Sequence, residues 1–130
     1  MELTEADDRF LLGPSTIPGA GTGLFAKVSL EPGDQLEVIG VLIPAETESD
    51  RCTAYADRYK FRVGDRLLIP VGFGALLNHS NTPNMEKVIE GDRVYLRAIS
   101  RVSAGEELTF RYSQFAQDQI SCLEPAKPAP

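Results

Sequence analysis

The chain has 130 residues, of which 42 % are hydrophobic and 25 % charged, so it is long enough to bury the core of one soluble globular domain. Its 13 lysines and arginines against 19 aspartates and glutamates give a net charge of −6. This argues against a direct nucleic-acid partner, because phosphate binding needs clustered positive charge. The acidic balance is compatible with a lysine-rich protein partner, but it also keeps an ordinary protein soluble.

The sequence lacks the patterns of secreted, membrane and zinc-binding proteins. Its N-terminus is acidic where a signal peptide would be basic, and no apolar run approaches the ~20 residues of a membrane span. We therefore expect a cytoplasmic protein without membrane contact. Cys52 and Cys122 lie far apart and there is one histidine, so we expect no metal site. A reducing compartment fits two unpaired cysteines, and a disulfide between them stays open.

The first third of the chain is predicted to form a glycine-rich loop followed by two strands. Residues 15–23 place glycines at the alternate positions 19, 21 and 23, where positive φ angles and close approach to a ligand are available. Residues 24–28 and 35–43 are predicted strands, the second rich in β-branched residues. A Pro-Gly turn at residues 31–34 joins them.

The middle of the chain is predicted to form a loop, a short helix and two short strands. Residues 44–50 are polar and typical of a loop. Tyr55 and Tyr59 are four apart, as on one helix face, whereas residues 59–63 alternate like a strand, so we expect a helix followed by a strand. Residues 66–69 are the next predicted strand, which Pro70 is expected to stop.

The last third of the chain predicts a hairpin, a final strand and a loose tail. Residues 85–89 and 93–98 flank Glu90-Gly91-Asp92, a good hairpin signal. Residues 107–112 form the last predicted strand, after which the pattern fades and prolines accumulate. Many short strands between Gly/Pro turns predict a mostly β protein with one or two short helices.

Most polar chemistry is concentrated in Leu76-Leu77-Asn78-His79-Ser80-Asn81-Thr82-Pro83-Asn84, which holds the only histidine. Asn, His and Ser offer donors and acceptors within one tight turn, where a plain surface turn would more often use Asn-Gly or Asp-Gly. We expect this segment to be buried and to bind a ligand. Taken alone, His79 is better explained as a hydrogen-bonded core histidine than as a ligand-binding residue.

The sequence argues against three common functional motifs. A dinucleotide fingerprint starting at Gly21 would place Ala26 at its third glycine, but that motif should open a helix and here a strand follows. No Gly-Lys-Ser/Thr of a phosphate-binding loop occurs. Ser80 adjoins His79 in the chain, so their side chains diverge and a Ser-His-Asp site is disfavoured.

Three segments in order resemble the SET-domain family of protein-lysine methyltransferases. They are Gly21-Thr22-Gly23-Leu24-Phe25-Ala26, Asn78-His79-Ser80 with Pro83-Asn84, and Gly105-Glu106-Glu107-Leu108-Thr109-Phe110 with Tyr112. Each is weak alone, but their order and spacing over about residues 15–112 make the resemblance specific. By this resemblance residues 14–114 are a SET-like catalytic domain, between an N-terminal arm (1–13) and a C-terminal tail (115–130).

The resemblance implies a SET-type β-clip fold of short strands, in which the Asn-His-Ser segment and the last strand form a C-terminal pseudoknot. It also implies methyl transfer from S-adenosyl-L-methionine to the ε-amine of a lysine in a protein or peptide substrate. The residues implied to bind this cofactor are Ala20, Gly21, Thr22, Gly23, Asn78, His79 and Tyr112.

The resemblance further implies that Tyr112 is the catalytic residue, with its hydroxyl beside the methyl-transfer channel. Phe110 lies on the same strand face and is expected to wall the substrate channel. Tyr59 is a second candidate for that channel. Glu106 and Glu107 point to opposite faces of a strand, so we expect structural hydrogen bonds there rather than a pair of catalytic acids.

The sequence departs from the family pattern at several positions. Val38 stands where many relatives have an active-site tyrosine, and Arg111 replaces an acidic residue common before the last tyrosine. Two alternatives therefore stay open: a catalytically inactive SET-fold binding module, and a methyltransferase for a small amine. Because the chain is short, a homodimer or residues 113–130 could supply a wall of the substrate groove.

Overall fold

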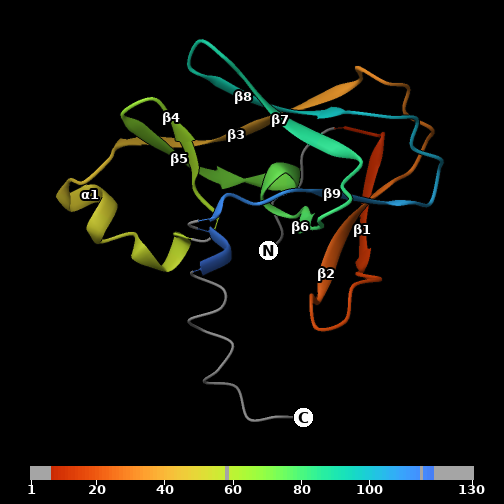
Figure 1. Cartoon of the computed structure of the whole chain (residues 1–130), viewed down its shortest axis with the longest axis horizontal. Helices are drawn as coiled ribbons and strands as arrows, with labels where there is room; N and C mark the ends of the chain where they lie inside the picture. Colours follow the sequence, from red (N-terminus) through yellow and green to blue (C-terminus); the bar gives the residue numbers. More distant parts are fainter. Residues whose placement is uncertain (1–6, 58, 115, 119–130) are drawn as a thin grey trace.

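The computed structural model of the chain describes residues 7–57, 59–114 and 116–118 (Figure 1). Within these residues, strands β1 to β9 form two sheets, and the helical structure consists of one four-residue helix, short 3-10 turns and the helical residues 114 and 116–118. The mostly β architecture expected from short strands between Gly/Pro turns is confirmed. No helix in the described part of the chain is long and apolar enough to cross a membrane.

The first sheet has the strand order β1-β2-β9-β6 and contains the knot of the fold. Its strands are β1 (Phe10–Pro14), β2 (Thr22–Ala26), β9 (Glu107–Phe110) and β6 (Asn78–His79). β1 and β2 are an antiparallel hairpin joined by the glycine-rich loop, whereas β6 lies parallel to β9. A segment from the middle of the chain is thereby inserted beside the last strand, which builds the pseudoknot.

The second sheet is antiparallel and has the order β4-β5-β3-β8-β7. Its strands are β4 (Phe61–Val63), β5 (Arg66–Val71), β3 (Gln35–Pro44), β8 (Arg93–Ala98) and β7 (Met85–Glu90). Helix α1 (Glu48–Arg51) lies at the end of the molecule away from the β1–β2 hairpin, and 3-10 turn η1 (Ala54–Ala56) follows it (Figure 1). A second 3-10 turn, η2 (Gly72–Ala75), connects β5 to the segment that carries β6.

One hydrophobic core joins the two sheets. Along β8, Val94, Leu96 and Ala98 are buried while their neighbours point outward, the period-2 pattern expected of a strand with one covered face. Leu24 of β2, Leu77 before β6 and Leu108 of β9 contribute to the same cluster. These leucines adjoin the polar motifs in sequence, so their burial in the core fixes the positions of the neighbouring polar residues.

Pro70 does not stop its strand, contrary to expectation. It lies inside β5, opposite Gly40 of β3. β4 pairs with β5 only as far as Leu68, so the other side of Pro70 is a sheet edge where its missing N–H breaks no ladder bond. Glycine is needed at position 40 because a Cβ there would lie 1.9 Å from the Ile69 carbonyl oxygen.

Helix and strand boundaries around residues 44–63 also differ from those expected. α1 begins inside the predicted loop, at Glu48, and β4 begins at Phe61 rather than at Tyr59. The Ala56 carbonyl accepts hydrogen bonds from the amides of Tyr59 and Lys60, at 2.8 and 3.1 Å, so the turn continues through these residues. The strand-like alternation of polar and apolar residues at 59–63 did not reveal this turn.

Both ends of the SET-like region carry more regular structure than expected. Residues 10–13, assigned above to the N-terminal arm, form most of β1 and pair with β2. The last strand ends at Phe110, two residues early, because the amide of Tyr112 donates to a side chain instead of a neighbouring strand. Gln114 and residues 116–118 are helical, and Ala116 is buried. The remainder of the expected tail, including Cys122, lies outside the described residues.

Candidate active site

Tyr112 is held in place by the knotted segment. Its hydroxyl donates to the Leu77 carbonyl oxygen at 2.7 Å, and its amide donates to Nδ1 of His79 at 2.9 Å. Its ring lies 5.2 Å from the His79 ring and 5.0 Å from the Phe110 ring, measured between centroids. The tyrosine is therefore fixed at both its backbone and its hydroxyl, as a positioning role in chemistry requires.

His79 serves this arrangement from within the fold. Because its Nδ1 accepts from the Tyr112 amide, its Nε2 carries the proton and faces Oδ1 of Asn81 at 3.2 Å. The segment is less buried than expected: Leu77 is fully covered, Asn78 and His79 are half-buried, and Asn81 is exposed. The reason is that β6 lies at the edge of its sheet.

Asn84 secures the knot through its side chain. Its amide nitrogen donates to the Glu107 carbonyl oxygen, and its Oδ1 accepts from the Thr109 amide, both at 2.9 Å. The Asn84 side chain thus pairs with backbone groups of β9 that would otherwise need a neighbouring strand. The Pro-Asn part of the motif thus has a structural function next to the site.

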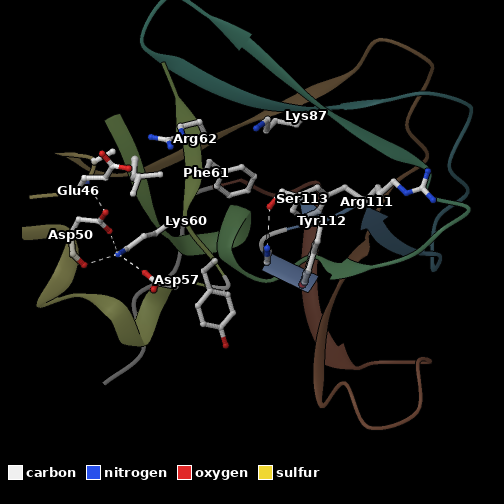
Figure 2. A pocket seen from close by; sticks show the side chains of 15 residues that line it. Glu46, Asp50, Asp57, Lys60, Phe61, Arg62, Lys87, Arg111, Tyr112 and Ser113 are labelled. Atoms are coloured by element: carbon white, nitrogen blue, oxygen red, sulfur yellow. Dashed lines mark hydrogen bonds and ion pairs between the residues drawn. The ribbon is translucent and has the colours of Figure 1, made fainter. Parts of the chain in front are cut away.

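Two cavities meet at Tyr112. The first, here the Asn78 cavity, has a volume of about 480 Å³ and includes Ala20, Thr22, Leu77, Asn78, Tyr59 and Tyr112 in its lining. The second, here the Phe110 cavity, has a volume of about 620 Å³ and is drawn in Figure 2. Its lining includes Phe61, Lys87, Phe110, Tyr59 and Tyr112. Since Tyr59 and Tyr112 line both cavities, they stand between them.

The cavities divide the residues implied by the resemblance into two sets. Ala20, Thr22, Asn78 and Tyr112 come together on the Asn78 cavity. Phe110, Tyr59 and Tyr112 come together on the Phe110 cavity, where the rings of Phe110 and Phe61 are stacked with centroids 5.6 Å apart. Three residues do not line either cavity: Gly21, Gly23 and His79.

Gly23 lies against polar side chains beside the Asn78 cavity. A Cβ at this position would come within 2.5 Å of Glu107 Oε2 and 3.3 Å of Asn78 Nδ2. A larger residue here would displace the Glu107 carboxylate from its hydrogen bonds. Gly21 has a φ of 76°, which glycine adopts without strain, in the turn that brings Ala20 and Thr22 to the cavity.

Glu107 is the site residue that sequence reasoning missed. Its Oε2 accepts from Ser15 Oγ at 2.8 Å and from Asn78 Nδ2 at 3.0 Å. Its Oε1 accepts from the Thr16 amide and hydroxyl at 2.8 and 2.7 Å. Burial by itself raises the pKa of Glu107, but these hydrogen bonds outweigh it, so the pKa is lowered. Glu107 ties the glycine-rich loop to Asn78.

The two neighbouring glutamates act separately, as expected. Among the described residues, the Glu106 side chain accepts one hydrogen bond, from the Ser103 amide at 3.0 Å in the preceding turn. Glu107 is on the opposite face, toward the loop. The sequence offered one signal for Glu107, its position within a segment that resembles the family. No spacing rule joins positions 15, 16, 78 and 107, so its partners could not be predicted.

Lys60 forms a charged wall of the Phe110 cavity (Figure 2). Its ammonium lies 2.7 Å from a carboxylate oxygen of Asp50 and 2.7 Å from one of Asp57, and its side chain is only 3 % exposed. Burial lowers the pKa of Lys60, but the hydrogen bonds to both carboxylates outweigh this effect and raise it. The cluster connects α1, η1 and β4.

Val38, which stands where relatives have a tyrosine, lies in the core rather than at a cavity. It is 2 % exposed and packs so closely on η2 that a Cβ at Gly74 would lie 2.9 Å from it. Tyr59 instead presents an aromatic ring to both cavities. Among the residues that the structure describes, no three His, Cys, Asp or Glu side chains are grouped to hold a metal ion.

The candidate site therefore combines the pseudoknot formed by β6 and β9 with one fixed tyrosine, Tyr112, that lines two cavities. The model of the SET domain matches residues 21–113, and the chain belongs to the SET-domain family. The chain is 32 % identical over 119 residues to an H3 lysine-4-specific histone-lysine N-methyltransferase of Mycosarcoma maydis. This alignment covers 78 % of the chain but 8 % of that relative, so most of the relative has no counterpart here.

Solved structures show the same fold. A chain of an active polycomb repressive complex 2 in the basal state matches with a TM-score of 0.70 and 28 % identity, over 81 % of this chain and 15 % of that chain. A Plasmodium falciparum protein assigned as a candidate histone methyltransferase has a TM-score of 0.65 and 22 % identity. The match covers 83 % of this chain and 96 % of the other, so the fold is shared over nearly its whole length.

Proposed function

We propose that this chain transfers a methyl group from S-adenosylmethionine to the ε-amine of a lysine in a protein substrate. The observation that carries the proposal is the position of Tyr112, hydrogen-bonded to the Leu77 carbonyl and shared by both cavities. The SET-domain match and the relative named as a histone-lysine N-methyltransferase support lysine as the acceptor. The Asn78 cavity would take the cofactor and the Phe110 cavity the substrate lysine.

The lining of the Asn78 cavity suits the cofactor in size and chemistry. When bound, S-adenosylmethionine supplies a methyl carbon activated by a sulfonium. Ala20, Thr22 and Asn78, which line the cavity, would hold it, while Gly21 and Gly23 shape the loop behind them. The Asn78 amide nitrogen donates to the Thr22 carbonyl at 3.1 Å and to Glu107, so both of its hydrogens are engaged. Its Oδ1 accepts no hydrogen bond from the described residues and would be available to a cationic ligand group.

The Phe110 cavity suits a lysine that must lose its charge. A nucleophilic amine has to be neutral, and the aromatic walls formed by Phe61, Phe110 and Tyr112 disfavour the ammonium by desolvation. The oxygens of Tyr112 and Leu77 then orient the lone pair of the amine toward the donor side. The lysine ammonium would first release its proton to solvent. One N–C bond would then form as the C–S bond of the donor breaks, with the electron pair staying on sulfur, and the product would be a methylammonium.

Binding of the cofactor is the first test. Titration calorimetry of the full chain with S-adenosylmethionine should give measurable affinity, and Asn78→Ala should lose at least tenfold because it removes both the Oδ1 acceptor and the link to Glu107. Absence of binding to the unaltered chain contradicts the proposal.

Methyl transfer is the second test. With tritiated cofactor and a mixture of core histones as the protein probe, Tyr112→Phe should lower the rate by about 100-fold, the cost of losing one preorganised polar group at a reacting centre. Tyr95→Phe on β8 is the matched control and should not change it. Cofactor binding without transfer to any protein would favour the inactive binding module, for which the core position of Val38 is the structural support.

A further inference from the structure

The Phe110 cavity carries a charge opposite to that of the chain. The protein has a net charge of −6, yet the ionisable lining of this cavity consists of more cations than carboxylates: Lys60, Arg62, Lys87 and Arg111 against Glu46, Asp50 and Asp57. Two of the carboxylates are already bound by Lys60. A cavity for the target lysine alone would not need this excess of positive charge.

Lys87 occupies a position on β7 where an apolar residue is expected. It lies in one row with Met85, which is buried, and with Ile89, which like Lys87 is exposed. The cross-strand partners of this row on β8 are Ala98, Leu96 and Val94, all of which are buried. Glu86 and Glu90 belong to the other row, so the acidic neighbours of Lys87 in sequence point away from it.

The Lys87 ammonium has no anionic partner among the described residues. No ion pair or side-chain hydrogen bond joins it to Glu46, Asp50 or Asp57, which line the same cavity. Burial therefore lowers the pKa of Lys87 without compensation from a nearby carboxylate. Lys60 is the contrasting case, since two carboxylates keep it charged in the same cavity. Lys87 is exposed and lies in the wall of the cavity, and among the described residues no carboxylate neutralises it, so its ammonium is available to an anion that arrives with a ligand.

We propose that Lys87 forms a subsite for a carboxylate of the protein substrate, an aspartate or glutamate side chain close in sequence to the methylated lysine. Arg62 of β4 lies along the same edge of the cavity, while Lys60 and its carboxylates form another part of the wall (Figure 2). This inference rests on the proposed function, since it assigns the Phe110 cavity to the substrate. It makes the enzyme selective for an acidic neighbour of the target lysine.

The test is selection from a lysine-centred peptide library on the immobilised full chain, with every flanking position randomised. The unaltered chain should enrich Asp and Glu over Asn and Gln by about tenfold at one flanking position, which corresponds to about 1.4 kcal/mol. Lys87→Met, which restores an apolar row on β7, should lose that enrichment. Lys87→Glu should replace it with enrichment of Lys or Arg. Lys27→Met, the same substitution at an exposed lysine outside the cavity, should retain it.

Two results would overturn the subsite: no acidic enrichment in the unaltered chain, or the same enrichment in Lys87→Met. Because the readout is peptide binding, it is separate from the tests of the proposed function. Methyl transfer that is indifferent to acidic neighbours would remove the subsite and leave the function intact. Absence of cofactor binding would remove the function whatever the library shows.

Discussion

Replacement of Glu107 by glutamine is the sharpest probe of how the site is assembled. The carboxylate accepts four hydrogen bonds, two at each oxygen, from Ser15, Thr16 and Asn78. Glutamine has nearly the same shape but presents an NH2 group in place of one oxygen. At that position one N–H group, from Thr16 or Asn78, would face a donor, while the hydroxyl of Thr16 or Ser15 would have to turn and accept. The other two donors would bond a neutral acceptor instead of a charged one.

The magnitude follows from these bonds. A hydrogen bond to a charged group contributes about 1.5–3 kcal/mol net, and water can replace part of that in a half-exposed site. Losing one such bond and the charge from the other three should therefore lower the free energy of unfolding by about 2 kcal/mol. The larger effect should be on the cofactor, because the loop and Asn78 would no longer be held together. We expect its dissociation constant to rise by about tenfold, or about 1.4 kcal/mol.

Glu106→Gln is the matched control, since this neighbouring carboxylate accepts one bond from the Ser103 amide and does not touch the loop. Titration calorimetry with S-adenosylmethionine and urea unfolding would be measured on both variants and the unaltered chain. If Glu107→Gln bound the cofactor within twofold of the unaltered chain, the connecting role of Glu107 would be refuted. Equal losses in both variants would refute it as well.

Three more outcomes follow from close contacts and charges. Gly23→Ala places a Cβ 2.5 Å from Glu107 Oε2, so calorimetry should show at least tenfold weaker cofactor binding, whereas Gly13→Ala on β1 meets ordinary contacts and should not. Lys60→Met leaves two carboxylates together without their cation and should lower stability to urea by about 3 kcal/mol. Because the folded pKa of Lys60 is raised, its contribution is present below its ordinary pKa of 10.5 and is lost as pH rises through the folded value. The variant should therefore show a flatter alkaline stability profile in thermal unfolding. Unchanged urea stability or an unchanged profile would contradict the role of this cluster.

Strand positions were largely predictable from local sequence. Alternation along residues 93–98 and the Gly91 turn identified the β7–β8 hairpin, because one face of each strand is covered by the core and a positive φ suits glycine. The errors arose where a distant element decided the outcome. Pro70 is tolerated because β4 is too short to reach it, and β9 ends early because His79 takes the Tyr112 amide.

The candidate site was predictable in part for the same reason. Short-range motifs indicated the glycine-rich loop, Asn78 and Tyr112, since turn chemistry and a concentrated set of polar residues are local features. Glu107 carried no such signal. Its partners are brought to it by the pairing of β2 with β9 and of β6 with β9, which no local period encodes.

The sequence by itself determined the strands, the turns and the family resemblance, because hydrophobic period, glycine conformation and motif order are properties of neighbouring residues. The tertiary structure alone decided that Tyr112 stands between two cavities and that Glu107 joins the glycine-rich loop to Asn78. It also decided that Lys87 enters a cavity without an anionic partner among the described residues. These features depend on parallel pairing of a middle segment with the last strand. Such long-range contacts form only when the whole core closes around Leu24, Leu77 and Leu108.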